Sequence, residues 1–297
     1  MELGPFFKRV YLEITNICNQ SCPFCPRTSR APKFLSRDDF DLILTKLQGH
    51  TKHLYFHVLG EPLLHLELPR FLDEAHSQGY WVNLVTNGSL IAMVGPELMT
   101  KPALRQISFS LHSLAHLGEE ITRERLAQIL QFVDQATQET AMYCSLRLWT
   151  GGIEHNRVVI ETLTQHYGLD FDLTAQLASN QGRGIALGER IFLNPAEEFA
   201  WPSLEAPLQV GRAFCHGLRQ QLAILVDGTV VPCCLDGQGV IALGNIHQED
   251  LGEIYTSPRV QEILQGFHDG VAVEELCQRC DYRTRFTTDE KNQPHPR

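Results

Sequence analysis

Short β-rich runs alternate with amphipathic stretches from Arg9 to about residue 172, and this alternation constrains the fold more than any other feature. The runs expected to form strands are RVYLEIT (9–15), KHLYFHV (52–58), YWVNLVT (80–86), RQISFSL (105–111), YCSLRLW (143–149) and LDFDLTA (169–175). Strands that alternate with helices form parallel sheets. The sequence therefore predicts an α/β fold, a partial (β/α)6 TIM-like barrel whose functional groups lie at the carboxyl ends of its strands.

The helices between these runs can be placed by the spacing of their apolar residues. Ser36 is positioned to cap a helix whose apolar stripe recurs at i, i+3, i+4 and i+7, at Phe40, Ile43, Leu44 and Leu47. The same spacing recurs later in the chain, at Leu126, Ile129, Leu130 and Val133. Each stripe predicts a helix that packs one face against the sheet.

The C-terminal third has a different organisation. Residues 176 to about 212 are rich in turn formers and predict an irregular connection between domains. Beyond it, LAILV-DG-TVVPC is typical of a β-hairpin that turns at Asp227-Gly228, and a helix stripe follows around residues 260–267. We expect a partial barrel over residues 1–205 and a small α+β domain, a β-hairpin plus helix, over residues 206–297, with a disordered tail DEKNQPHPR.

Charge and hydropathy limit the possible partners. The chain has 35 acidic and 25 basic residues, and its net charge of -10 repels a phosphate backbone. No run approaches the roughly 20 apolar residues that span a bilayer, and the N-terminus lacks the apolar segment of a signal peptide. We therefore predict a cytoplasmic protein with no nucleic-acid or membrane partner, in which the nine cysteines serve metal or redox chemistry.

Three of these cysteines, Cys18, Cys22 and Cys25, fall in one loop directly after the first predicted strand. A structural zinc site normally has four ligands, whereas an iron-sulfur cluster held by three cysteines leaves one iron free to bind another molecule. A zinc knuckle or chance spacing is the alternative. The pattern C-x3-C-x2-C, with Phe24 as the aromatic residue before the last cysteine, resembles the signature of the radical S-adenosylmethionine (radical SAM) superfamily.

The resemblance extends to the ends of the next strands. Gly60-Glu61-Pro62 is similar to the family's GGE-type motif, which implies that Glu61 receives the methionine amino group of S-adenosylmethionine (SAM); Leu59 replaces the usual first glycine. Further cofactor contacts are implied for the turn after the third strand and for the fourth and fifth strands, at Thr86, Asn87, Ser110 and Arg147. The alternatives are an exposed carboxylate in a strand-to-helix turn for Glu61 and a structural ion pair for Arg147.

Two residues are candidates for catalytic groups near the substrate. His112 alternates with Ser108 and Ser110 and is therefore expected on the same strand face, although an interior histidine with a structural role is the alternative. Asp236 follows a cysteine pair in the sequence CCLD. Other residues that could line the substrate space are His57, Asn180 and Arg183.

A second cysteine group lies in the C-terminal third. Cys215 and Cys233 have 17 residues between them, and after 43 more residues Cys277 and Cys280 form a CxxC pair. The spacing resembles the twitch form of the SPASM domain, which implies one auxiliary [4Fe-4S] cluster; a four-cysteine zinc ribbon is the alternative. Spacing favours Cys233 over the adjacent Cys234 as the ligand, and this choice stays open.

The resemblance also implies a reaction. A [4Fe-4S] cluster on Cys18, Cys22 and Cys25 binds SAM, and one electron from a flavodoxin or ferredoxin cleaves it to methionine and a 5'-deoxyadenosyl radical that abstracts hydrogen. The auxiliary cluster favours a two-electron oxidation of a small-molecule or peptide substrate, so we expect an oxidoreductase of dehydrogenase or maturase type. The alternatives are a peptide-modifying maturase that forms a crosslink or modified residue, and an inactive metal-stabilised binding protein.

Overall fold

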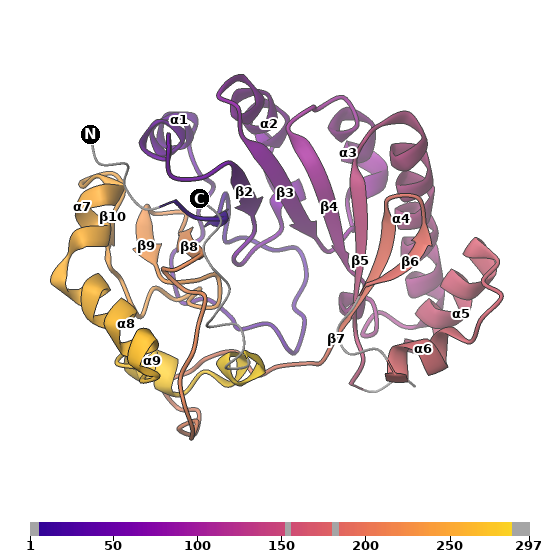
Figure 1. Cartoon of the computed structure of the whole chain (residues 1–297). Helices are drawn as coiled ribbons and strands as arrows, with labels where there is room; N and C mark the ends of the chain where they lie inside the picture. The colour runs from indigo at the N-terminus through magenta and orange to yellow at the C-terminus, as the bar shows by residue number, and fades with distance from the viewer. Residues whose placement is uncertain (1–5, 152–155, 180–183, 287–297) are drawn as a thin grey trace. The chain divides into compact units, whose positions relative to one another are not determined.

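The computed structural model describes residues 6–151, 156–179 and 184–286, so the predicted tail and the candidates Asn180 and Arg183 lie outside the described residues (Figure 1). The chain divides into two compact units. Unit 1 combines residues 1–16, 23–54 and 199–297, and unit 2 combines residues 17–22 and 55–198. The functional boundary expected between residues 205 and 206 stays a prediction. No helix in the described ranges is long and apolar enough to cross a membrane.

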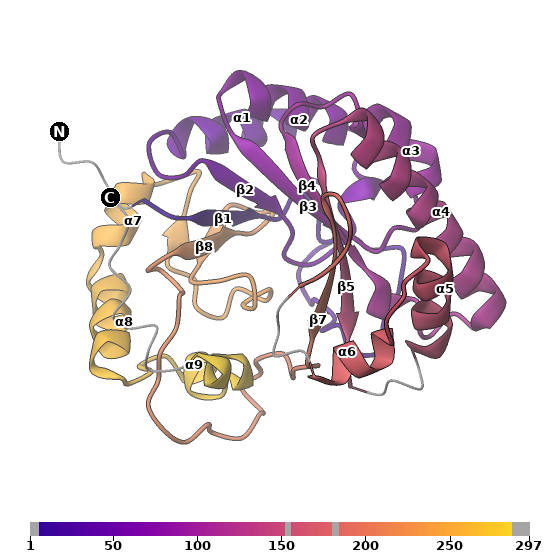
Figure 2. The same ribbon diagram turned by 45° about the vertical axis from the view of Figure 1, so that its right-hand side comes forward.

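Unit 2 is built on a mostly parallel sheet. Strands β3 (Trp81–Thr86), β4 (Leu104–Ser110), β5 (Tyr143–Trp149) and β7 (Ile191–Ala196) pair in that order in parallel, and β6 (Ile185–Gly188) pairs with β7 in antiparallel fashion. The longer helices α2 (Leu68–Ser77), α3 (Ile91–Leu98), α4 (Glu119–Glu139) and α5 (Arg157–Tyr167) lie along the outer side of the sheet (Figure 2). Short helical segments are η1 (Pro62–Leu64), η2 (Leu111–Ser113) and α6 (Leu173–Ser179).

Apolar burial between helix α4 and the sheet explains this arrangement. The predicted stripe Leu126, Ile129, Leu130 and Val133 is buried on α4. Gly88, in the turn after β3, has a φ of +75°, and a Cβ there would lie 2.7 Å from the Ile129 side chain. Only glycine tolerates both that backbone conformation and the close approach of the helix.

Unit 1 contains strand β1 (Arg9–Leu12), which pairs in parallel with β8 (Gln221–Ile224). The predicted hairpin is confirmed, because β8 and β9 (Thr229–Val231) pair in antiparallel fashion around Asp227-Gly228, and β10 (Gly244–Asn245) pairs with β9. The other elements are α1 (Arg37–Lys46), α7 (Leu251–Thr256), α8 (Pro258–Asp269), α9 (Glu275–Gln278) and η4 (Asp281–Arg285). Strand β2 (His53–Phe56) spans the point where the chain passes from unit 1 to unit 2.

Two expectations about residues 169–212 are wrong. No strand forms at 169–175: residues 169–172 are irregular and helix α6 begins at Leu173. Leu173 and Leu177 are buried one helical turn apart, and the Asp172 carboxylate accepts a hydrogen bond from Ala175 N. The parallel partner of β5 is instead β7, which falls in the segment expected to be irregular. The turn formers there flank a short β6–β7 hairpin. The α/β class with a parallel sheet is confirmed, and the described strands of neither unit close into a barrel.

Candidate active site

The turn after strand β2 presents Glu61 to the first cysteine loop. Gly60 has a φ of +78°, which lets the chain reverse before Glu61 begins the short helix η1. The backbone N–H of Glu61 donates to Ile17 O at 2.8 Å, and Ile17 immediately precedes Cys18. The predicted acid and the predicted ligand loop are therefore joined by a main-chain hydrogen bond.

The Glu61 carboxylate is almost fully buried and holds a defined hydrogen-bond network. Its Oε1 accepts from Thr86 Oγ1 at 2.6 Å and from Leu63 N at 3.0 Å, and its Oε2 accepts from Asn87 N at 2.7 Å. Burial raises the pKa of Glu61, and these hydrogen bonds oppose that shift. An ionised carboxylate offers about four acceptor positions, so three bonds leave one position and a buried negative charge for a cationic amino group.

Asn87 links this carboxylate to the first cysteine. Its Nδ2 donates to Asn19 Oδ1 at 3.0 Å and lies 3.9 Å from Cys18 Sγ. The structure thus brings together Glu61, Thr86, Asn87 and Cys18, four residues predicted from the ends of three strands. Sequence reasoning missed Asn19, although its position between two predicted ligand cysteines was the available signal.

The thiols of this loop suit a metal cluster by their chemistry. Burial raises the pKa of Cys18 and, with the Cys18 thiol as a further cause, that of Cys22. Such thiols stay protonated at neutral pH unless a metal replaces the proton, since coordination deprotonates a thiol outright. Cys25 is exposed and Phe24 is half-buried; both belong to unit 1. The donor set fits a three-thiolate cluster.

Ser110 is the last residue of β4, and its register partner Arg147 lies near the end of β5, which continues to Trp149. Their side chains therefore leave neighbouring strands at the carboxyl edge of the sheet in unit 2. The expectation that His112 shares the strand face with Ser108 and Ser110 is wrong, because β4 ends at Ser110 and His112 lies on η2. A change from strand to 3-10 helix breaks the two-residue alternation.

His112 is instead fixed by stacking and by a backbone contact. Its ring stacks on Trp149 at a centroid distance of 4.2 Å and an interplanar angle of 7°, and its Nδ1 lies 3.3 Å from Arg147 O. Burial, followed by the charge of Arg147, lowers the pKa of His112 to about 3. The pKa of His57 is lowered to about 3 by the same two causes. Both imidazoles are therefore neutral at pH 7, and of these three side chains only Arg147 carries a positive charge. Sequence reasoning missed the stacking role of Trp149.

The second cysteine group gathers within unit 1. Cys215 precedes β8, Cys233 follows β9, and Cys277 and Cys280 lie in and after α9. Burial raises the pKa of Cys215 to about 11 and that of Cys233 well above its usual range, and repulsion from neighbouring thiols, Cys234 among them, adds to both shifts. Mutually interacting thiols suit a cationic centre that replaces their protons. In the part of the chain that the structure describes, no group of three or more His, Cys, Asp or Glu side chains has an arrangement that could hold a single metal ion.

Asp236 organises the loop that follows the Cys233-Cys234 pair. Its carboxylate is 2% exposed and accepts from Ile241 N at 2.7 Å and from Val240 N at 2.9 Å. Burial raises the pKa of Asp236, and these two hydrogen bonds oppose the shift. The contacts are those of a loop-stabilising carboxylate, and a catalytic role for Asp236 stays a prediction.

Family models match both cysteine-containing parts of the chain. The family model of the radical SAM superfamily matches residues 12–154, and the model of the SPASM iron-sulfur cluster-binding domain matches residues 215–281. The first range includes the three-cysteine loop, Glu61 and Arg147, and the second begins at Cys215 and extends just past Cys280. The first family uses a [4Fe-4S] cluster with SAM, and the second carries auxiliary iron-sulfur clusters.

Two curated relatives illustrate the range of similar proteins. A tungsten-containing aldehyde ferredoxin oxidoreductase cofactor-modifying protein of Pyrococcus furiosus is 23% identical over 298 residues, which cover 85% of this chain and 82% of the relative. An S-adenosylmethionine-dependent nucleotide dehydratase of Selenomonas ruminantium is 32% identical over 93 residues, 31% of this chain and 33% of that protein.

Solved structures share the fold. SuiB of Streptococcus suis bound to S-adenosylmethionine superposes with a TM-score of 0.60 at 16% identity, covering 88% of this chain and 68% of SuiB. BtrN in complex with AdoMet and 2-DOIA gives a TM-score of 0.54 at 16% identity, covering 94% of each chain. The chain therefore belongs to the radical SAM superfamily and is a radical SAM enzyme, with a [4Fe-4S] cluster, SAM and a C-terminal SPASM-type domain for auxiliary iron-sulfur chemistry.

Proposed function

We propose that this enzyme catalyses a two-electron oxidation of its substrate with SAM as a consumed cosubstrate. The observation that carries the proposal is the gathering of interacting thiols in the part of unit 1 that the SPASM model matches, from which spacing selects Cys215, Cys233, Cys277 and Cys280 as the ligands and leaves out Cys234. A cluster with four thiolate ligands has no vacant iron for substrate, so it suits electron acceptance. Overall, the substrate loses one hydrogen atom, one further electron and one proton, and SAM with one added electron yields methionine and 5'-deoxyadenosine.

Each residue at the strand ends has a proposed part in binding SAM. Cys18, Cys22 and Cys25 hold the first [4Fe-4S] cluster, beside Phe24. Glu61 receives the methionine amino group and is kept in place by Thr86 and Asn87, while the Arg147 guanidinium pairs with the methionine carboxylate. Gly60 and Ser110 line the remaining methionine and ribose positions. When bound, these groups supply the 5'-deoxyadenosyl radical that removes a hydrogen atom from the substrate.

The proposed substrate is a small molecule or a peptide, and His112 and Asp236 are proposed to lie near it. BtrN was solved with the small molecule 2-DOIA and SuiB with its precursor peptide SuiA, so related folds accept both classes. Because His112 is neutral at pH 7, it suits a hydrogen-bond or proton-accepting role rather than charge pairing. The proposed electron donor is a flavodoxin or a ferredoxin.

Replacement of Glu61 by glutamine is expected to weaken SAM binding by about tenfold or more, because the buried ion pair with the amino group is lost. In the variant, the glutamine side-chain NH2 group replaces Glu61 Oε2, which accepts a hydrogen bond from Asn87 N. Two donors then face each other, so this hydrogen bond is lost as well. The measurement is anaerobic calorimetric titration of SAM into the reconstituted protein. Glu97→Gln on the exposed surface of α3 makes the same charge change and serves as the control. Equal SAM affinity in both variants would contradict the role given to Glu61.

The proposed oxidation is tested by mass spectrometry after anaerobic incubation with SAM, dithionite and a pool of candidate metabolites and peptides. The expected result is 5'-deoxyadenosine together with a product about two mass units lighter than its substrate. Deuterium in the substrate should appear in 5'-deoxyadenosine. A product that gains mass would indicate group transfer instead. Failure to form 5'-deoxyadenosine with fully loaded clusters would indicate an inactive binding protein.

A further inference from the structure

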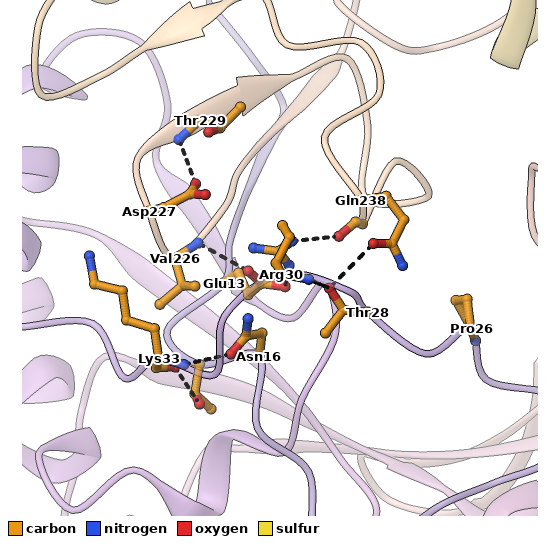
Figure 3. Close-up of polar contacts among 12 residues, drawn as sticks. Glu13, Asn16, Pro26, Thr28, Arg30, Lys33, Val226, Asp227, Thr229 and Gln238 are labelled. Atoms are coloured by element: carbon orange, nitrogen blue, oxygen red, sulfur yellow. Dashed lines mark hydrogen bonds and ion pairs between the residues drawn. The ribbon is translucent and has the colours of Figure 1, made fainter.

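Residues 26–33, the segment that follows Cys25, are held by hydrogen bonds at both ends within unit 1 (Figure 3). At its far end, Lys33 N donates to Asn16 Oδ1 at 2.8 Å. At its near end, next to Cys25, the segment meets Gln238, whose Nε2 donates to Arg27 O at 2.7 Å and whose Oε1 accepts from Ser29 N at 3.2 Å. A single side chain therefore pairs with the main chain on both sides of Thr28.

Arg30 adds a buried ion pair to these contacts. Its Nη2 lies 2.7 Å from Glu13 Oε1, and the side-chain exposures of Arg30 and Glu13 are 13% and 0%. The Arg30 Nε donates to Gly237 O at 3.0 Å, and Glu13 Oε2 accepts from Val226 N at 3.0 Å. Arg30 thus joins the end of strand β1, the segment after Cys25 and the loop that contains Gln238.

That loop begins at the auxiliary cysteine pair. Asp236 N donates to Cys233 O at 3.2 Å, and the Asp236 carboxylate accepts from the backbone of Val240 and Ile241. These bonds make residues 233–241 one compact turn, so a displacement at Cys233 is carried to Gly237 and Gln238. Both of these residues contact the segment after Cys25.

We propose that Gln238 and Arg30 are positioning residues that couple the two cysteine groups: the auxiliary group fixes the 233–241 turn, and the turn fixes the segment after Cys25. The inference rests on the two-cluster assignment proposed above. With Cys215, Cys233, Cys277 and Cys280 bound to a cluster, Gln238 and Gly237 hold Cys25 in the arrangement that retains the first cluster and its SAM. Loss of the hydrogen bonds between the 233–241 turn and the segment after Cys25 makes Cys25 more mobile and removes no metal ligand.

Gln238→Ala is the most informative variant, because it removes the two main-chain contacts and leaves the buried ion pair intact. Gln265→Ala is the matched control, since Gln265 lies on the surface of α8 in the same unit and donates to Asp269. Arg30→Lys keeps a positive charge beside Glu13. A lysine ammonium lacks the planar, forked donor arrangement with which the guanidinium binds both Glu13 and Gly237 O. Thermal unfolding verifies that each variant folds.

Two readouts report on the first cluster without relying on turnover. One is the share of the reduced-cluster electron paramagnetic resonance signal that changes when SAM is added, and the other is the rate of iron loss to a chelator. In Gln238→Ala the SAM-responsive share is expected to fall and iron loss from the first cluster to rise about fivefold, as for the loss of one or two hydrogen bonds. Gln265→Ala should match the unmodified protein, and Arg30→Lys should lie between them.

The coupling itself is tested by adding Gln238→Ala to a Cys233→Ala background. If the auxiliary group acts through Gln238, Cys233→Ala alone reproduces the effect on the SAM-responsive signal and the second change adds little. Independent, additive losses would overturn the coupling, as would a Gln238→Ala protein that behaves like Gln265→Ala. If the unmodified, iron-loaded protein has no SAM-responsive signal, the proposed function itself is wrong. This outcome differs from failure of the coupling, in which the unmodified protein responds to SAM and the variants respond equally.

Discussion

Substitution of Cys18, Cys22 and Cys25 together by alanine is expected to lower 5'-deoxyadenosine formation by at least about a thousandfold, since loss of outer-shell partners alone costs about 10–100-fold at metal sites. The three thiols lie close together in the sequence, inside the range that the radical SAM model matches, and the first of them contacts the Glu61 network through Asn87. The measurement is anaerobic chromatography of 5'-deoxyadenosine from SAM and dithionite.

Cys144→Ala is the matched control for this prediction. Cys144 is fully buried on β5, and burial raises the pKa of its thiol to about 12, so it has the character of a core residue rather than a ligand. The variant should keep SAM cleavage and lose only a little stability. Persistent 5'-deoxyadenosine formation by the triple variant would contradict the assignment of the first cluster.

Cys280→Ala is expected to separate SAM cleavage from substrate oxidation. Without the auxiliary cluster, 5'-deoxyadenosine formation should fall severalfold, because Gln238 no longer holds the segment after Cys25 in place. The amount of oxidised product per 5'-deoxyadenosine should fall by about a hundredfold or more. The physical reason is that the substrate radical loses its electron acceptor. The measurement is the ratio of product to 5'-deoxyadenosine by mass spectrometry.

Two neighbouring cysteines provide the control for this second prediction. Cys233 and Cys234 both lie among the mutually repelling thiols of this part of unit 1, so spacing alone selects Cys233 as the ligand. Cys233→Ala should therefore behave like Cys280→Ala, while Cys234→Ala keeps the product ratio. A normal ratio in Cys280→Ala would show that oxidation does not need the auxiliary group, and the reverse pattern at Cys233 and Cys234 would reassign the ligand.

The parts of the site that follow from strand topology could be predicted from the sequence. Glu61, Thr86 and Asn87 each lie at or just beyond the carboxyl end of a strand, and the carboxyl ends of parallel strands meet at one edge, so their proximity needs no knowledge of side-chain packing. The hairpin at Asp227-Gly228 was predictable because local turn chemistry determines it.

Other features depend on tertiary packing and were not predictable. Residues 169–175 alternate like a strand, yet Leu173 and Leu177 are buried as neighbours on a helix. A change from strand to 3-10 helix after Ser110 moves His112 off the strand face that alternation predicted. The ion pair of Glu13 with Arg30 and the contacts of Gln238 join residues 17 to more than 200 positions apart, and no local pattern encodes such pairs.

The most direct test of the two-cluster enzyme is iron, sulfide and zinc analysis of the anaerobically reconstituted protein beside its Cys18/Cys22/Cys25→Ala variant. Two [4Fe-4S] clusters predict about eight irons per chain that fall to about four in the variant, with no zinc. About four irons that fall to none, with one zinc retained by both proteins, would contradict the auxiliary cluster and make the C-terminal cysteine group a structural zinc site.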